Sequence, residues 1–213
     1  MPQYYTRALP NAAAASNFIY NHQMPRKPII AVVGAGRETE PAVSNARELG
    51  RLIAEQGWVL VTGGRNAGVM RAASEGAKRS SAVVNKTGRN TSVSEGAKEE
   101  NADKTITIGV LPNKDTEVSP DVDIVIVTDT GEARNNIIVL SADVVIACGV
   151  DDPGTASEVS LALKAGKPVL LVDIDDRARD FFLGMGNTIS AVESAKEAID
   201  VSNRIISEIK GQK

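Results

Sequence analysis

The sequence has very little of two residue types that often carry chemistry or cross-links. Among 213 residues it contains one cysteine, Cys148, and one histidine, His22. A single cysteine excludes a disulfide within the chain, and its place at the end of an apolar run is typical of a small core side chain. The histidine precedes the first predicted core strand, which excludes a Ser-His-Asp triad or a multi-histidine metal site in the core. We therefore expect no bound metal or resident cofactor, and any chemistry would use carboxylate, arginine, lysine, hydroxyl or backbone groups.

Long apolar runs and an excess of positive charge are also missing. No run approaches the roughly 18 residues of a membrane-spanning helix. The net charge of -3 gives no general electrostatic reason to bind nucleic acid or an anionic membrane. We therefore expect a cytoplasmic protein with neither nucleic acid nor a membrane as a partner. A length of 213 residues suits one sizeable domain rather than two.

The stretch 144–172 predicts the strand–helix–strand unit around which the chain is organised. Two apolar runs, Val144–Cys148 and Val169–Val172, flank a helical pattern with Thr155 as the expected N-cap. Parallel strands need such a crossover, and helices normally cover both faces of their sheet. We predict an α/β fold, a single doubly wound, mostly parallel Rossmann-like sheet with helices on both faces. The loop 149–155 would then open at the end of a central strand, opposite a helix N-terminus that favours an anion.

The remaining patterns predict the domain organisation. Residues 1–27 are expected to form an N-terminal arm that packs on its own domain or on a neighbouring subunit, and residues 28–213 the Rossmann-like domain. A polar segment, about 79–103, is expected to be a surface insertion. Further strands are predicted at 28–33, 58–61, 105–111 and 123–127. Further helices are predicted at 41–56, in the stretch after Asn136 that ends at about Ser141, and at 190–210.

Two glycine-containing turns follow the first two predicted strands. The first, Gly34-Ala35-Gly36, lacks the third glycine of the dinucleotide fingerprint, so an ordinary NAD site is not expected there. The second contains Gly63, Gly64 and Gly68, which allow a tight turn and let backbone N–H groups approach a phosphate. A glycine-rich turn without a ligand is the alternative, but the recurrence of such a turn at Gly149 favours binding.

Three motifs in sequence order resemble those of the LOG-like Rossmann superfamily. They are Gly63-Gly64-x-x-x-Gly68-x-Met70, Gly131-x-Ala133-Arg134-Asn135 and Pro153-Gly154-Thr155-x-x-Glu158. The superfamily includes LONELY GUY-type phosphoribohydrolases, proteins labelled as lysine decarboxylases and a molybdenum-cofactor carrier branch. The Ala-Arg-Asn form is more similar to the carrier-like and uncharacterised branch than to the hydrolases.

The resemblance implies roles for particular residues and a homodimer or larger homo-oligomer. Arg134 and Glu158 fall on the two positions that support catalysis in the hydrolases, and Gly154 and Thr155 fall on the phosphate-binding turn. The other implied ligand or phosphate contacts are Gly34, Gly36, Gly63, Gly64, Gly68, Met70, Gly131 and Asn135. This chain has Asp151-Asp152 where the hydrolases have paired glycines. Two carboxylates there would repel a phosphate unless they point away or are neutralised.

Two functions stay open at this point. The first is a protein that binds a phosphorylated nucleotide-like ligand and could hydrolyse the N-glycosidic bond of nucleoside 5′-monophosphates. An ionised Glu158 would stabilise the positive charge that develops on the ribose, and Arg134 would clamp the phosphate or base. The alternative is a non-catalytic carrier or sensor of a phosphorylated pterin, the molybdenum cofactor, or of a signalling nucleotide. Thr155 to Glu158 also match a capping box, in which the glutamate serves only to start a helix.

Overall fold

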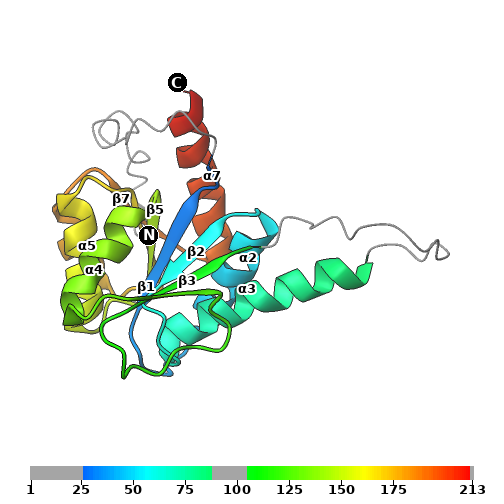
Figure 1. Cartoon of the computed structure of the whole chain (residues 1–213). Helices are drawn as coiled ribbons and strands as arrows, with labels where there is room; N and C mark the ends of the chain where they lie inside the picture. Colours follow the sequence, from blue (N-terminus) through cyan, green and yellow to red (C-terminus); the bar gives the residue numbers. More distant parts are fainter. Residues whose placement is uncertain (1–25, 88–104, 212–213) are drawn as a thin grey trace, which may run out of the picture.

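A single sheet of parallel strands forms the centre of the molecule (Figure 1). The computed structural model describes residues 26–87 and 105–211. The strand order is β4-β3-β2-β1-β5-β6-β7, and every neighbouring pair is parallel. The strands are β1 Ile29–Gly34, β2 Val59–Thr62, β3 Thr107–Leu111, β4 Ile124–Val127, β5 Val144–Cys148, β6 Val169–Val172 and β7 Ile189–Val192. The predicted α/β fold with a doubly wound sheet is confirmed.

Helices cover both faces of this sheet. They are α2 Ala42–Glu55, α3 Gly68–Thr87, α4 Arg134–Ser141, α5 Pro153–Lys164, α6 Asp176–Gly184 and α7 Ala195–Gly211, with a 3₁₀ turn, η2, at Gly131–Ala133. In Figure 1, α4 and α5 lie on one side of the sheet, and α2, α3 and α7 lie on the other. Side chains of a strand point alternately to its two faces. Accordingly Ile30 and Val32 of β1 belong to the core under α2, α3 and α7, while Ala31 and Val33 belong to the core under α4, α5 and α6.

The strand order fixes where a site can form. The chain winds from β1 outwards to β4 and then returns to place β5 beside β1, so the connections after β1 and β5 run to opposite faces. In open α/β sheets a crevice forms outside the carboxyl ends of the strands at such a switch point. The loops after Gly34 and Cys148 meet there.

Helices α2 and α3 approach each other unusually closely on their side of the sheet. A Cβ added to Gly50 would lie 1.9 Å from the carbonyl oxygen of Ala73, and one added to Gly76 would lie 1.9 Å from that of Arg47. Only glycine fits at the two positions, because any side chain would overlap the backbone of the facing helix. These helices follow the loops after β1 and β2, so their contact sets how those loops lie.

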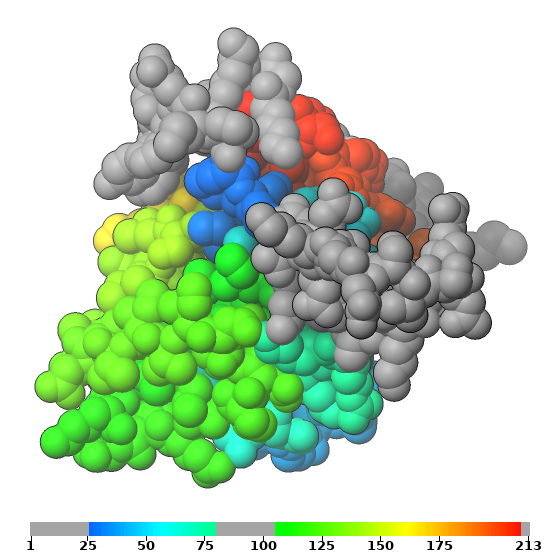
Figure 2. Space-filling model, turned by 45° about the vertical axis from the view of Figure 1, so that its right-hand side comes forward, coloured from blue at the N-terminus to red at the C-terminus, as the bar shows by residue number. Residues whose placement is uncertain are grey.

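The outer edge strand, β4, is poorly covered. Its residues, Ile-Val-Ile-Val, are all apolar, and their relative exposures lie between 42% and 49%. Within the described residues β4 pairs with β3 on one side only. Figure 2 shows the green segment that contains β4 on the outside of the molecule.

Several predicted bounds were wrong. Residues 189–192 form β7 beside β6, because Ile189 and Val192 are buried, and α7 begins only at Ala195. Helix α3 runs to Thr87 and so includes the first residues of the expected surface insertion, about 79–103, which stays a prediction. Residues 1–25 of the expected N-terminal arm, 1–27, and residues 88–103 of the expected insertion lie outside the described residues.

Candidate functional site

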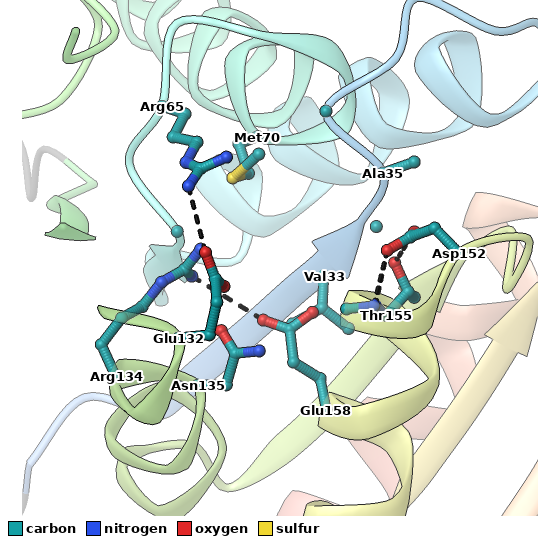
Figure 3. Close-up of a pocket in the computed structure, with 14 residues that line it drawn as sticks. Val33, Ala35, Arg65, Met70, Glu132, Arg134, Asn135, Asp152, Thr155 and Glu158 are labelled. Atoms are coloured by element: carbon teal, nitrogen blue, oxygen red, sulfur yellow. Dashed lines mark hydrogen bonds and ion pairs between the residues drawn. The ribbon is translucent and has the colours of Figure 1, made fainter. Parts of the chain in front are cut away.

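A pocket opens at the switch point between β1 and β5. It is open to solvent, and its walls come from the loops after β1 and β2, from η2 and the start of α4, and from the start of α5 (Figure 3). The structure brings these residues expected from the sequence to its lining: Gly34, Gly36, Gly63, Met70, Arg134, Asn135, Gly154, Thr155 and Glu158. Asp152, which the sequence places beside the phosphate-binding turn, also lines the pocket, and the lining residues that were not predicted are Val33, Ala35, Arg65 and Glu132.

Three expected glycines do not line the pocket. Gly64 has a φ of +73°, and its N–H donates to Oγ1 of Thr62. Gly68 has a φ of +50°, and its N–H donates to the carboxylate of Glu38. The N–H of Gly131 donates to the carbonyl of Pro112. These residues shape the turns that hold the pocket walls, since glycine adopts positive φ without strain.

Arg134 is the most deeply buried cation of the pocket. It is the first residue of α4, it is 5% exposed, and its Nη1 lies 3.8 Å from Oε1 of Glu158. The absence of a side chain at Gly63 makes room for it, because a Cβ there would lie 2.5 Å from Nη1 of Arg134. Burial lowers the pKa of Arg134, whereas Glu158 and Glu132 raise it. Its Nε and Nη1 have no hydrogen-bond partner among the described residues, so Arg134 offers free donors to a ligand.

Glu158, on α5, is the buried carboxyl group of the pocket. It is 6% exposed and accepts no hydrogen bond from any described residue; its ion pair is the one with Arg134. Burial raises the pKa of Glu158 to about 8, although Arg134 acts to lower it. The raised pKa favours the protonated form of Glu158 near neutral pH, whereas the sequence predicts an ionised carboxylate. The reason is that the desolvation of a carboxylate buried in a pocket outweighs a guanidinium 3.8 Å away.

The N-terminus of α5 is capped by a different residue from the one predicted. Asp152 is the N-cap, and its carboxylate accepts hydrogen bonds from the N–H groups of Gly154 (2.7 Å) and Thr155 (3.1 Å) and from the Thr155 hydroxyl (2.5 Å). The helix begins at Pro153, so the capping box expected between Thr155 and Glu158 does not form. The carboxylate of Asp152 thus occupies donors that the family resemblance assigns to a phosphate. Its neighbour Asp151 points to Arg37, with 3.0 Å between Oδ2 and Nη2.

Two charged residues at the mouth of the pocket were not predicted. Arg65 follows β2, and Glu132 lies in η2; Nη2 of Arg65 is 3.1 Å from Oε1 of Glu132. Figure 3 shows the Glu132 carboxylate reaching between Arg65 and Arg134. Nη2 of Arg134 lies 3.7 Å from Oε2 of Glu132, and the Nε of Arg65 is buried without a hydrogen-bond partner among the described residues. Neither residue stands out in the sequence, because 67 positions separate them and only the fold brings them together.

Asn135 completes the polar lining. Its side-chain N–H donates to Oγ of Ser157 at 3.3 Å, and its Oδ1 is buried without a partner among the described residues. Buried polar atoms are nearly always hydrogen-bonded, so such orphaned atoms in a pocket indicate groups that a ligand or water satisfies. The pocket therefore combines guanidinium donors, an amide acceptor and a carboxylic acid that can donate or accept.

Metal binding and membrane insertion find no support in the described part of the chain. Within residues 26–87 and 105–211, no three His, Cys, Asp or Glu side chains are grouped closely enough to hold a metal ion. None of the helices described there has the length and apolar character needed to span a membrane.

Comparison with known proteins places this chain in a family. The sequence profile of the SLOG cluster4 family matches residues 27–85 and 85–199. The chain belongs to the SLOG cluster4 family. This confirms the predicted membership of the LOG-like Rossmann superfamily.

Solved structures similar to this SLOG cluster4 protein include molybdenum-cofactor proteins. The molybdenum cofactor binding protein from Rippkaea orientalis is 46% identical, with a TM-score of 0.70 over 85% of this chain and 98% of that chain. The Moco carrier protein from Chlamydomonas reinhardtii is 40% identical, with a TM-score of 0.71 over 86% of this chain and 99% of that chain. An uncharacterized protein from Archaeoglobus fulgidus is 39% identical over 140 residues, which are 66% of this chain and 76% of the relative.

Proposed function

We propose that this protein is a non-catalytic carrier of the molybdenum cofactor, a phosphorylated pterin, which it binds in the pocket between the ends of β1 and β5. The observation that carries the proposal is the 46% and 40% identity to a molybdenum cofactor binding protein and a Moco carrier protein, over 98% and 99% of those chains. The cofactor is cargo in this proposal rather than a resident group.

The polar lining of the pocket suits such a ligand. The pyrimidine edge of a pterin carries both N–H donors and carbonyl or ring-nitrogen acceptors. Oδ1 of Asn135 and the carboxyl of Glu158 can accept from those donors, and Glu158 while protonated can also donate. The guanidinium groups of Arg65 and Arg134 suit the anionic part of the ligand. Binding would thereby satisfy buried polar atoms that have no hydrogen-bond partner among the described residues.

Two features favour binding over hydrolysis. The role that the hydrolase reading gives Glu158, stabilising an oxocarbenium-like transition state, needs an ionised carboxylate. Burial raises the pKa of Glu158 to about 8, which favours the protonated form and so disfavours that role. In addition, Asp152 takes up the N–H groups of Gly154 and Thr155, which the resemblance assigned to the phosphate of a hydrolase substrate.

The proposal is tested by looking for cargo. The protein is produced in a host that synthesises the cofactor, and pterin is measured by the fluorescence of its oxidised form and molybdenum by mass spectrometry. We expect the two to co-purify with the protein and to be transferred to a cofactor-free molybdenum enzyme, which becomes active. Arg134→Gln should lose the cargo, while Arg177→Gln, an exposed arginine of α6 outside the pocket, should retain it.

The hydrolase is the outcome that would replace this proposal. Each variant is also incubated with a panel of nucleoside 5′-monophosphates, and free base is measured by chromatography. Absence of pterin together with base release that disappears in Glu158→Gln would identify a phosphoribohydrolase instead.

The assembly and the location of the protein stay predictions. The homodimer or larger homo-oligomer implied by the superfamily resemblance is tested by light scattering coupled to size-exclusion chromatography. The cytoplasmic location is tested by cell fractionation.

A further inference from the structure

We infer that Arg65 and Arg134 form the subsite for the phosphate group of the ligand, and that Glu132 is an internal anion that this phosphate displaces. The inference rests on the proposed function only in taking the ligand to be phosphorylated. It assigns roles to Arg65 and Glu132, and it moves the phosphate away from the helix N-terminus that the motif Pro153-Gly154-Thr155 suggests.

The geometry between the two arginines is that of an occupied anion site. The carboxylate of Glu132 has one oxygen 3.1 Å from Nη2 of Arg65 and the other 3.7 Å from Nη2 of Arg134 (Figure 3). The two guanidinium groups come from separate elements, the loop after β2 and the start of α4, and converge on one acidic group. Planar guanidinium groups bind carboxylate and phosphate oxygens in the same way, so a position that holds a carboxylate also suits a phosphate.

Glu132 satisfies this site only in part. Nε and Nη1 of Arg134 and Nε of Arg65 are buried and have no hydrogen-bond partner among the described residues. Arg134 itself is 5% exposed and lines the pocket. A phosphate monoester brings three terminal oxygens and up to two negative charges, where a carboxylate brings two oxygens and one charge. A phosphate can therefore reach donors that Glu132 leaves unsatisfied.

Glu132 is also easier to displace than the other carboxylate near the pocket mouth. Its side chain is 65% exposed, and its ion pairs at 3.1 Å and 3.7 Å are of the weak, solvent-screened kind. Asp152, in contrast, accepts three hydrogen bonds and caps α5. A phosphate at the N-terminus of α5 would have to replace that cap. A phosphate between the arginines has to replace only the ion pairs of an exposed glutamate side chain.

The experiment measures binding of inorganic phosphate to the full chain by calorimetry, at constant ionic strength with chloride as the background anion. Glu132→Gln keeps the shape of the side chain and removes its charge, so we expect phosphate to bind about three- to fivefold more tightly than to the wild type. Arg65→Gln should weaken binding by at least about fivefold. Glu193→Gln, an exposed acid after β7, is the matched control for the loss of one negative charge and should leave binding unchanged.

Asp152→Asn separates the two locations for the phosphate. Tighter binding in Glu132→Gln and a smaller effect in Asp152→Asn supports the inference. Tighter binding in Asp152→Asn with no change in Glu132→Gln overturns it and returns the phosphate to the N-terminus of α5. No response of phosphate binding to either Glu132→Gln or Arg65→Gln also overturns it.

The outcome is independent of the test for the carrier function. If pterin co-purifies but the Arg65 and Glu132 variants do not alter phosphate binding, the subsite is wrong and the carrier proposal stands. If the variants respond as expected but no pterin is retained, the subsite stands and the cargo is a different phosphorylated molecule.

Discussion

Replacing Glu158 by glutamine is expected to flatten the pH dependence of the free energy of unfolding. In the folded protein, burial raises the pKa of Glu158 from its ordinary value of 4.5 to about 8. Between these two pH values the folded chain keeps a proton that the unfolded chain releases. The stabilisation from this group is therefore fully present below about pH 4.5 and is lost as the pH rises to about 8.

The size of the effect follows from the pKa values. Each pH unit over which the two states differ by one bound proton changes the free energy of unfolding by about 1.4 kcal/mol. A rise in pKa from 4.5 to about 8 thus corresponds to a loss of up to about 5 kcal/mol across that range. Glutamine is neutral at every pH and nearly isosteric with glutamate, and Arg134 keeps its pairing with Glu132. The variant therefore lacks the pH-dependent part of the free energy of unfolding that comes from Glu158.

The measurement is urea unfolding of the wild type and Glu158→Gln between about pH 5 and pH 9. We expect the difference in free energy of unfolding, wild type minus variant, to fall by roughly 1.4 kcal/mol per pH unit up to about pH 8 and then to level off. Glu193→Gln, which changes an exposed acid, should run parallel to the wild type. Parallel curves for the wild type and Glu158→Gln would refute the reasoning, because they would mean that Glu158 ionises alike in both states.

Three further predictions concern the parts that hold the pocket. Gly50→Ala places a Cβ 1.9 Å from the carbonyl oxygen of Ala73, so urea unfolding should show a loss of about 3 kcal/mol, while Gly184→Ala, with open space around it, should stay within about 0.5 kcal/mol of the wild type. Asp152→Ala removes the cap of α5 and should cost about 1 kcal/mol, whereas Asp152→Asn keeps an acceptor and should cost less; equal losses in the same unfolding assay would speak against the cap. Burial raises the pKa of Cys148 to about 12, so a thiol reagent at neutral pH should label the protein only after denaturant is added, and rapid labelling of the folded protein would contradict its burial.

Much of the fold could be predicted because parallel strands buried on both faces have a plain signature. The runs Val144–Cys148 and Val169–Val172 are continuous apolar segments, and both are fully buried strands. The short strand β7 was missed because Ile-Ser-Ala-Val also fits a helical pattern, and only its pairing with β6 decides the conformation. The start of α5 was placed too late because Asp152 and Thr155 are both good N-caps, and sequence cannot say which side chain reaches the N–H groups.

The site was predictable only where its residues lie in motifs. Arg134 and Glu158 stand in two of the three motifs and do meet in the pocket. Arg65 and Glu132 were missed, because an arginine and a glutamate in polar loops look like ordinary surface residues until the loops meet. The raised pKa of Glu158 was also not predicted, since it depends on how completely the folded chain buries this one carboxyl group.

The edge strand β4 has a practical consequence for work with the purified protein. β4 is short, with four residues, but it carries no charged or proline side chain, and such side chains are among the features that prevent two sheets from joining edge to edge. We expect this edge to favour aggregation during concentration and storage, and more so as the protein concentration rises. Val125→Lys would introduce a protective charge on this exposed strand, at the edge of the sheet away from the pocket lining.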